Sequence, residues 1–519
     1  MKSRTKMTAK NAFWSYFSMI ITLIIGFVSR TIFIKYLGEV YLGVNGLFTN
    51  VLGILSFAEL GIGTAINFSL YKPVANGDIE KIKSYMHYYK IAYRIIALII
   101  TVLGLALVPF LKYIVKDPGE VGDIRIYYLL FLVDTVTSYF VTYKFSLVNA
   151  EQKNYIFTNI NLILGITKSI VQIIVIILFK DYLYYLCFGI CFSLFQKIFV
   201  AKYLNKLYPY LLDKDVQPLE RQEKKTLITK IKSLVIHNIG DICVKQTDNI
   251  IISAFVNVAT VGLLSNYYLI INNVSTYIGV LFSSATGSLG NFIATEDKNR
   301  QYDIFKVYRF IGFWFYGFTG IVLMILLKPF IVLWIGEKMV VEELVIGLIL
   351  INYYMVGQRI CFNNFKSAAG QFEKDKYIAL IQAIVNLTTS IALVKLIGLP
   401  GVYIGTLIQG AIASFSKPFL LFKIIFDKSS KYYFIDSLKY ALSITIAFII
   451  CWTIRIYLLE TVTLIRFIIM AVIVSIIPNL LFYILFRRRD EFLYINNLFK
   501  NSIKKIKSLF TVAIKKLSK

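Results

Sequence analysis

The sequence predicts an all-α polytopic membrane protein with about 14 transmembrane helices. Of its 519 residues, 58% are hydrophobic and only 16% are charged, whereas an average soluble protein has about 25% charged residues. The mean hydropathy is +0.69. Uncharged apolar runs of about 20 residues, the length that crosses a bilayer as a helix, recur along the whole chain. These runs do not alternate with polar residues, which excludes a transmembrane β-barrel.

The apolar runs can be taken in order along the chain. Each is bounded by charged or turn-forming residues, and the first lacks the small-residue cleavage site of a signal peptide. The expected spans are 11–34, 41–71, 88–115, 124–148, 157–179, 182–205, 233–256, 260–293, 307–328, 341–368, 377–397, 400–424, 433–458 and 462–486.

The basic residues indicate the topology. Lys and Arg are concentrated in the first ten residues, in alternate loops and after Phe486, whereas the loop Asn257–Ala259 has none. Cytoplasmic loops carry such an excess, and an even number of spans places both ends on one side. We therefore expect both termini in the cytoplasm. The net charge of +27 fits this topology and does not require nucleic acid as a partner.

The loop lengths indicate how the chain is divided. The longest loop separates the first six spans from the next six, and none is long enough for a catalytic domain, so we expect a transporter and no enzyme. A faint repeat supports two halves, because YLGEVYLG (36–43) and FVNVATVG (255–262) lie 219 positions apart. The expected regions are a six-helix bundle (1–207), a cytoplasmic linker (208–232), a second six-helix bundle (233–426), two extra helices (427–486) and a basic amphipathic tail (487–519).

The segment HNIGDICVKQTDNIII (237–252) places His237, Asp241, Lys245 and Asp248 in one span, at spacings of four, four and three. On a helix these positions share one stripe. Each charge near the bilayer centre costs ~2.5–3.5 kcal/mol, so the stripe faces protein or water. It is either a salt-bridge ladder between two helices or the wall of a polar cavity. His237 lies at the cytoplasmic edge and is treated as a bystander.

Other spans carry embedded charges as well. The cations are Arg30, Lys168 and Arg359, and the acids are Glu59 and Asp134. Arg30 can alternatively extend to the membrane surface. A cationic cavity without a nucleotide-binding loop is typical of a secondary transporter for an anionic head group.

The candidate sites follow from these charges. We assign substrate binding to Arg30, Lys168, Lys245 and Arg359, and coupling of a proton or sodium ion to Asp241, Asp248 and Glu59. We expect no structural metal and no other cofactor, because the five cysteines lie in apolar segments without further ligands.

Two segments carry a family resemblance. SRTIFIKYLGEVYLGVNGLFTNVLGILSFAELGIGTAINFSLYKP (29–73) and KQTDNIIISAFVNVATVGLLSNYYLIINNV (245–274) resemble the Wzx-type polysaccharide flippases of the multidrug/oligosaccharidyl-lipid/polysaccharide exporter superfamily. The resemblance implies two six-helix bundles in a V-shaped arrangement with a cationic central cavity. Arg30, Lys245 and Asp248 match the family's charge pattern, whereas the eighth span lacks a charge that is sometimes found there.

The resemblance also implies a function. Such a protein turns undecaprenyl-diphosphate-linked oligosaccharide repeat units across the cytoplasmic membrane of a bacterium, with polysaccharide polymerase and glycosyltransferases as partners. Two alternatives share the fold, namely a flippase for the peptidoglycan lipid precursor and a cation-coupled multidrug exporter. The four embedded cations balance the four embedded acids, which disfavours an exporter of cationic drugs. A membrane-embedded ligase or polymerase would need a large extracytoplasmic loop, which the sequence lacks.

Overall fold

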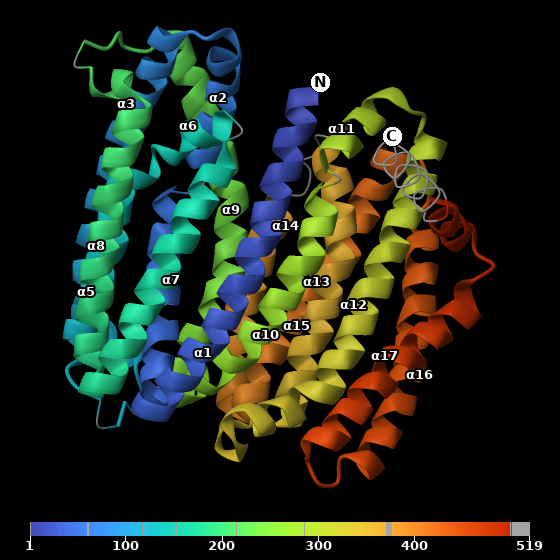
Figure 1. Cartoon of the computed structure of the whole chain (residues 1–519). Coiled ribbons are helices and arrows are strands. Elements are labelled where there is room, and N and C mark those ends of the chain that lie inside the picture. Colours follow the sequence, from blue (N-terminus) through green and yellow to red (C-terminus); the bar gives the residue numbers. More distant parts are fainter. Residues whose placement is uncertain are drawn as a thin grey trace, which may run out of the picture. The chain divides into compact units, whose positions relative to one another are not determined.

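The computed structural model describes residues 2–59, 62–116, 118–119, 121–151, 153–213, 215–284, 286–369, 376–498 and 500. Over these ranges every regular element is a helix and none is a strand (Figure 1). Eleven of the described helices are long and apolar enough to cross a membrane. The prediction of an all-α polytopic membrane protein is therefore confirmed.

The helices follow one another with short connections. In the first half they are α1 (Lys2–Leu55), α2 (Ile62–Asn76), α3 (Ile79–Leu107), α4 (Leu111–Ile114), α5 (Ile124–Thr142), α6 (Phe145–Ala150), α7 (Asn154–Phe179), α8 (Tyr182–Leu207) and α9 (Arg221–Phe255). In the second half they are α10 (Val258–Ser284), α11 (Thr286–Thr295), α12 (Lys298–Ile335), α13 (Glu343–Ala368), α14 (Lys376–Ile397), α15 (Leu399–Phe426), α16 (Lys431–Leu458) and α17 (Leu464–Phe486).

The first two predicted spans differ from the structure in their boundaries. The expected break between them is present, because α1 consists of two helical segments that meet at Gly38, where φ is 83° and the backbone is not helical; the second segment ends at Leu55. That φ lies in the left-handed region, which glycine adopts without a steric penalty. The second span is not continuous either, since a 3₁₀ turn from Ser56 to Glu59 follows α1 before α2 begins.

The predicted spans 233–256 and 260–293 correspond to α9 and α10. Neither helix is among the eleven apolar ones. The sequence of α9 carries charges along its whole length, and that of α10 is rich in Asn, Ser and Thr. Such polar helices are stable in a membrane only where protein or water covers their polar faces.

Contacts divide the chain into two compact units. Unit 1 comprises residues 1–266 and 379–405, and unit 2 comprises 267–378 and 406–519. Most of α14 thus belongs with the helices of the first half of the chain. The predicted six-helix bundles have other boundaries and remain a prediction from the sequence.

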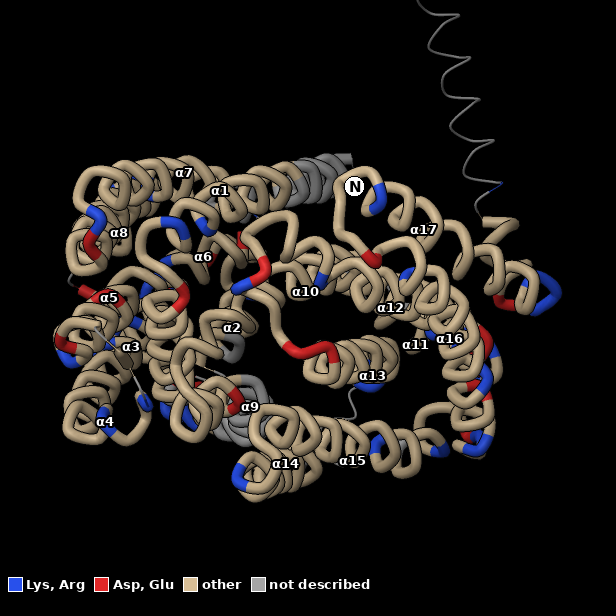
Figure 2. The backbone as a smooth tube through the Cα atoms, turned by 90° about the horizontal axis from the view of Figure 1, so that it is seen from below, with Lys and Arg blue, Asp and Glu red and all other residues tan. Residues whose placement is uncertain are grey.

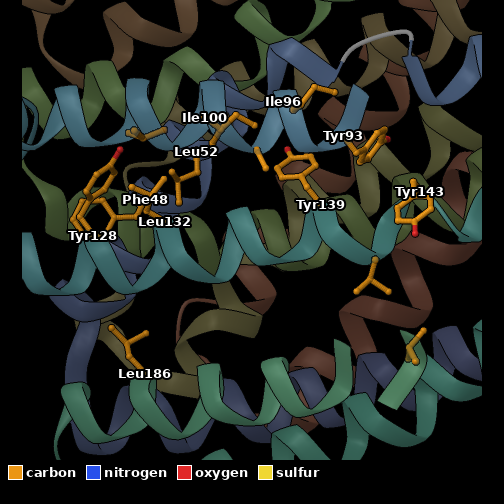
Figure 3. Packing of buried hydrophobic residues seen from close by; sticks show 14 of the residues in the cluster. Phe48, Leu52, Tyr93, Ile96, Ile100, Tyr128, Leu132, Tyr139, Tyr143 and Leu186 are labelled. Atoms are coloured by element: carbon orange, nitrogen blue, oxygen red, sulfur yellow. The ribbon is translucent and has the colours of Figure 1, made fainter. Parts of the chain in front are cut away.

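The core of unit 1 is rich in aromatic residues. Tyr89, Tyr93, Tyr128 and Tyr182 are almost completely buried, and the rings of α3 and α5 face one another in Figure 3. Buried tyrosine provides a large apolar surface and a hydroxyl that needs a hydrogen-bond partner. The core of this unit therefore supplies hydroxyl groups as well as apolar area.

In unit 2, α12 packs against α13, α16 and α17 (Figure 1). The rings of Phe313 and Tyr440 stack with their centroids 4.2 Å apart. Arg309 is 3% exposed, and its Nη2 donates to the Tyr433 carbonyl over 2.9 Å. The two C-terminal helices are therefore attached to α12 by an apolar cluster and a buried guanidinium.

Candidate functional site: charged groups inside the helices

Charged residues occupy a small part of the helices, most of which is tan in Figure 2. Arg30 lies in the first arm of α1, before the kink. Its Nη1 donates to the Ser265 hydroxyl of α10 over 2.8 Å, and Ser265 in turn donates to the Gly262 carbonyl over 2.7 Å. Arg30 forms no ion pair with any side chain that the structure describes. Its charge is thus held by a neutral partner only.

Close to Arg30, α1 and α10 touch through their backbones. A Cβ atom on Gly43 would lie 1.9 Å from the Val258 carbonyl oxygen, and one on Gly262 would lie 2.0 Å from the Glu39 oxygen. Any side chain larger than hydrogen would force the helices apart. Gly43 and Gly262 are also equivalent positions of the sequence repeat, 219 residues apart. The two copies of the repeat therefore contact each other at this crossing.

A second set of contacts consists of hydrogen bonds that join the end of α4 and the residues after it to the end of α9. The Ser253 hydroxyl donates to the Ile114 carbonyl over 2.8 Å, and the Lys116 ammonium donates to the Phe255 carbonyl over 3.2 Å. The Lys116 backbone also pairs with Ser253 and Val258. These hydrogen bonds and the glycine crossing hold the helices together at the end of unit 1 that is predicted to be extracytoplasmic.

Glu59 lies beside the tyrosines of α3 and α5. The Tyr93 hydroxyl donates to Glu59 Oε1 over 2.6 Å, and the Tyr89 hydroxyl donates to Tyr93 over 3.1 Å. The Tyr139 hydroxyl donates to Ser56 over 2.9 Å, and Figure 3 shows Tyr93 and Tyr139 near each other. A carboxylate in low dielectric is stabilised by such donors. The carboxylate was predicted from the sequence, whereas its tyrosine partners were not.

Lys168 of α7 lies inside unit 1, near an ion pair. The Lys197 ammonium is 2.6 Å from Asp134 Oδ1, and Ser193 donates to the same carboxylate over 2.6 Å. Lys168 interacts electrostatically with both Asp134 and Lys197. When all three groups are ionised, the cluster has one positive charge in excess. Lys197 was not predicted from the sequence as the partner of Asp134. It lies one helical turn from Ser193 on α8, so both side chains reach the same carboxylate.

Asp248 is the one member of the charged stripe whose side chain the structure describes. Its neighbour Thr247 donates to Asn386 Oδ1 of α14 over 3.2 Å. Asn386 is 1% exposed, and Gln382 and Ser390 on the same face are 7% and 0% exposed. These three polar residues follow one another at four-residue spacing in an apolar helix, much as the charged residues of the stripe do on α9. The same kind of pattern therefore identifies this face of α14.

The side chains of His237, Asp241 and Lys245 lie outside the described residues. Their roles therefore remain predictions from the sequence. Arg359 belongs to α13 of unit 2, where its Nη1 donates to the Gly410 carbonyl of α15 over 3.2 Å. Among the described residues, no three His, Cys, Asp or Glu side chains lie together so that they could hold a metal ion.

The fold is that of known lipid and drug transporters. The chain is similar to the lipid II flippase MurJ in its inward closed conformation, with a TM-score of 0.64, 16% identity, and 92% of this chain and 99% of that chain covered. It is also similar to a multidrug resistance MATE family transporter of the MOP superfamily in the inward-facing conformation, with a TM-score of 0.59, 14% identity and coverages of 76% and 92%.

A mutant of the Vibrio cholerae MATE transporter VcmN gives a TM-score of 0.55 at 14% identity, with 83% of this chain and 100% of that chain covered. No family model and no curated protein matches the sequence. At identities below 25%, these similarities show that the chain shares the fold of these proteins. Its eleven long apolar helices show a multi-pass membrane protein.

Proposed function

We propose that the chain is a secondary transporter that flips polyprenyl-diphosphate-linked oligosaccharide units across a bacterial cytoplasmic membrane, with both termini in the cytoplasm. The observation that carries the proposal is Arg30, a guanidinium within a membrane helix whose described partner is the neutral Ser265 hydroxyl. An unneutralised cation in low dielectric attracts an anion far more strongly than in water. A diphosphate offers the paired oxygens that guanidinium binds best.

The charge balance of unit 1 favours an anionic substrate over a cationic drug. Asp134 is paired with Lys197 at 2.6 Å, and Glu59 receives the Tyr93 hydroxyl at 2.6 Å. A drug exporter for cations needs a carboxylate whose charge is available to the drug. Among the side chains of unit 1 that the structure describes, Arg30 and Lys168 instead leave positive charge unmatched, which supports an anionic head group.

The proposed transport cycle involves the contacts at the predicted extracytoplasmic end of unit 1. The Gly43–Gly262 crossing and the hydrogen bonds of Lys116 separate when this end opens, and they form again when the other end opens. Asp248, which follows Thr247, the residue that donates to Asn386, is the group we assign to the coupling ion, which is a proton or sodium. Glu59 is a second coupling carboxylate. Polysaccharide polymerase and glycosyltransferases are the proposed partners.

A second candidate function has a specific observation in its favour. The lipid II flippase MurJ is covered over 99% of its length by this chain, so a lipid precursor of the peptidoglycan is an alternative substrate. Both substrates join a polyprenyl diphosphate to a sugar, and the chemistry assigned to Arg30 suits either.

Deletion of the gene distinguishes the two functions. The lipid-linked intermediates of the deletion strain are extracted and identified by mass spectrometry. Accumulation of an undecaprenyl-diphosphate-linked repeat unit, reversed by the wild-type gene, supports the main proposal. Accumulation of the peptidoglycan precursor supports the second function, and accumulation of neither contradicts both.

A further inference from the structure

A partly open cavity of about 320 Å³ lies between α1, α7 and α8 of unit 1. Its volume is at the lower end of small-molecule pockets and corresponds to about ten water molecules at ~30 Å³ each. Gly26 of α1 and Gly165 of α7 line it, and a Cβ atom on either glycine would meet nothing within 4 Å. The two glycines thus create part of the space.

The lining of this cavity is polar but uncharged. Its described lining residues include no Lys, Arg, Asp or Glu, which argues against a phosphate or a metal ion as the occupant. Each of its polar groups offers donors, acceptors or both, the combination that complements a hydroxyl. The polar side chains are Thr22, Ser29, Asn161, Ser169, Gln172 and Tyr185.

One of the two amides is oriented by a neighbour. Asn161 Oδ1 accepts from the Gln196 amide over 3.2 Å, which directs its own NH₂ group elsewhere. The Gln172 amide lies near the Tyr185 hydroxyl. Phe33 also lines the cavity, and its ring meets that of Tyr185 edge to face at 5.2 Å between centroids. Amides beside aromatic rings suit a ligand with both hydroxyl groups and an apolar ring face.

Ser29 supplies the second, independent observation. Its Oγ is buried and has no hydrogen-bond partner among the described residues. On the same helix, by contrast, Thr31 donates to the Phe27 carbonyl four residues earlier over 2.8 Å. An unsatisfied buried hydroxyl costs about 1–3 kcal/mol. Rotation about χ1 of Ser29 would turn this hydroxyl toward the cavity, where a polar occupant removes the cost.

We propose that the cavity is a subsite for one uncharged sugar ring of the transported lipid-linked glycan. The inference rests on the proposed function and names the part of the substrate that this region recognises. Ser29 precedes Arg30 in the sequence, so α1 presents a hydroxyl and a cation to neighbouring sectors about 100° apart. The same helix thereby recognises sugar and diphosphate, which are directly joined in the substrate.

Binding is tested by protection of a thiol. Ser169→Cys is introduced into a chain whose five native cysteines are replaced, and its alkylation by N-ethylmaleimide is followed in nanodiscs. The probes are undecaprenyl diphosphate bearing one N-acetylglucosamine, sugar-free undecaprenyl diphosphate, and free N-acetylglucosamine. At ten times the dissociation constant, mass action slows alkylation about tenfold. We expect this protection from the sugar-bearing lipid and the free sugar, and none from the sugar-free lipid.

Gly320→Cys is the matched control, because a Cβ atom there also meets open space but the residue belongs to unit 2. Its alkylation should not respond to any sugar. Equal protection of Ser169→Cys by both lipids would mean that the polyprenyl chain or diphosphate occupies the cavity, and would overturn the proposal. Absence of protection by every probe would indicate a cavity that holds water only, and would overturn it too.

A filling substitution gives a second readout. Gly165→Leu should reduce transport of the sugar-bearing lipid about tenfold, equivalent to ~1.4 kcal/mol, while Gly320→Leu should leave transport unchanged at equal protein abundance. Normal transport by Gly165→Leu would contradict the subsite. Protection by free sugar in a protein that flips no lipid-linked glycan would instead contradict the proposed function and leave the subsite in place.

Discussion

Gly43 of α1 and Gly262 of α10 occupy equivalent positions in the two halves of the repeat and lie against each other in unit 1. A Cβ atom on Gly43 would approach the Gly262 backbone nitrogen to 3.2 Å, and one on Gly262 would approach the Gly43 nitrogen to 2.9 Å. Two helices that cross this closely need glycine at the contact. In the proposed transport cycle, we infer that the crossing is a joint that forms when the predicted extracytoplasmic end closes.

The first prediction concerns this joint. Gly43→Ala and Gly262→Ala should each lower transport at least about tenfold, because the added methyl group makes the free energy of closure less favourable by more than ~1.4 kcal/mol. Gly46→Ala is the matched control on α1, because its Cβ atom would lie at an ordinary 3.5 Å from Val261. Transport by membrane vesicles with equal amounts of each variant is the measurement. Wild-type transport by both joint variants would contradict a closure role.

The Asp134–Lys197 pair leads to a prediction about stability. Lys197→Met should lower the free energy of unfolding by about 1–3 kcal/mol, because Asp134 loses its charged partner inside the membrane. The double variant Asp134→Asn, Lys197→Met should recover part of the loss, since no unpaired acid remains. Thermal unfolding of the detergent-solubilised proteins completes the cycle. Additive losses would show that the two groups do not interact energetically.

The tyrosines around Glu59 allow a prediction that separates function from stability. Tyr93→Phe removes the hydroxyl that donates to Glu59 over 2.6 Å and should reduce transport. Tyr128→Phe removes a buried hydroxyl that donates to the Gly104 carbonyl over 3.1 Å. Each variant should lose about 1 kcal/mol of stability, but Tyr128→Phe should transport normally. Equal transport by the two variants would remove Glu59 from the coupling groups.

The polar face of α14 predicts how transport depends on ions. Asp248→Asn and Asn386→Leu should abolish the stimulation of transport by a sodium or proton gradient. Thr388→Val is the control on the same helix, because Thr388 is exposed and donates to the Ile384 carbonyl over 2.8 Å. Transport rates in proteoliposomes are compared with and without each gradient. Undiminished stimulation in Asp248→Asn would assign the coupling elsewhere.

Much of the helical architecture could be predicted from the sequence, because apolar runs long enough to cross a bilayer have few alternatives to helix. The break between the first two spans was also predicted, between residues 34 and 41, and the structure has it at Gly38. The 3₁₀ turn from Ser56 to Glu59 could not be predicted, because the apolar run continues through it.

The embedded charges were visible in the sequence, whereas their partners were not. Arg30 and Glu59 could be identified because charge in an apolar run is costly. Their partners Ser265 and Tyr93 are brought to them by tertiary packing, over separations of up to 235 residues. Lys197 is brought to Asp134 in the same way. Asn386, which bonds to Thr247, was not predicted either, although the four-residue spacing of its polar neighbours on α14 is visible in the sequence.

The central claim is that Arg30 binds the diphosphate of a lipid-linked glycan. The most direct measurement is the flipping rate of undecaprenyl diphosphate bearing one sugar in proteoliposomes that contain wild-type, Arg30→Lys or Arg30→Ala protein. Arg30→Ala should flip at least about tenfold more slowly, a loss of ~1.4 kcal/mol or more, and Arg30→Lys should retain part of the rate because it keeps the charge. A wild-type rate in Arg30→Ala would contradict the claim.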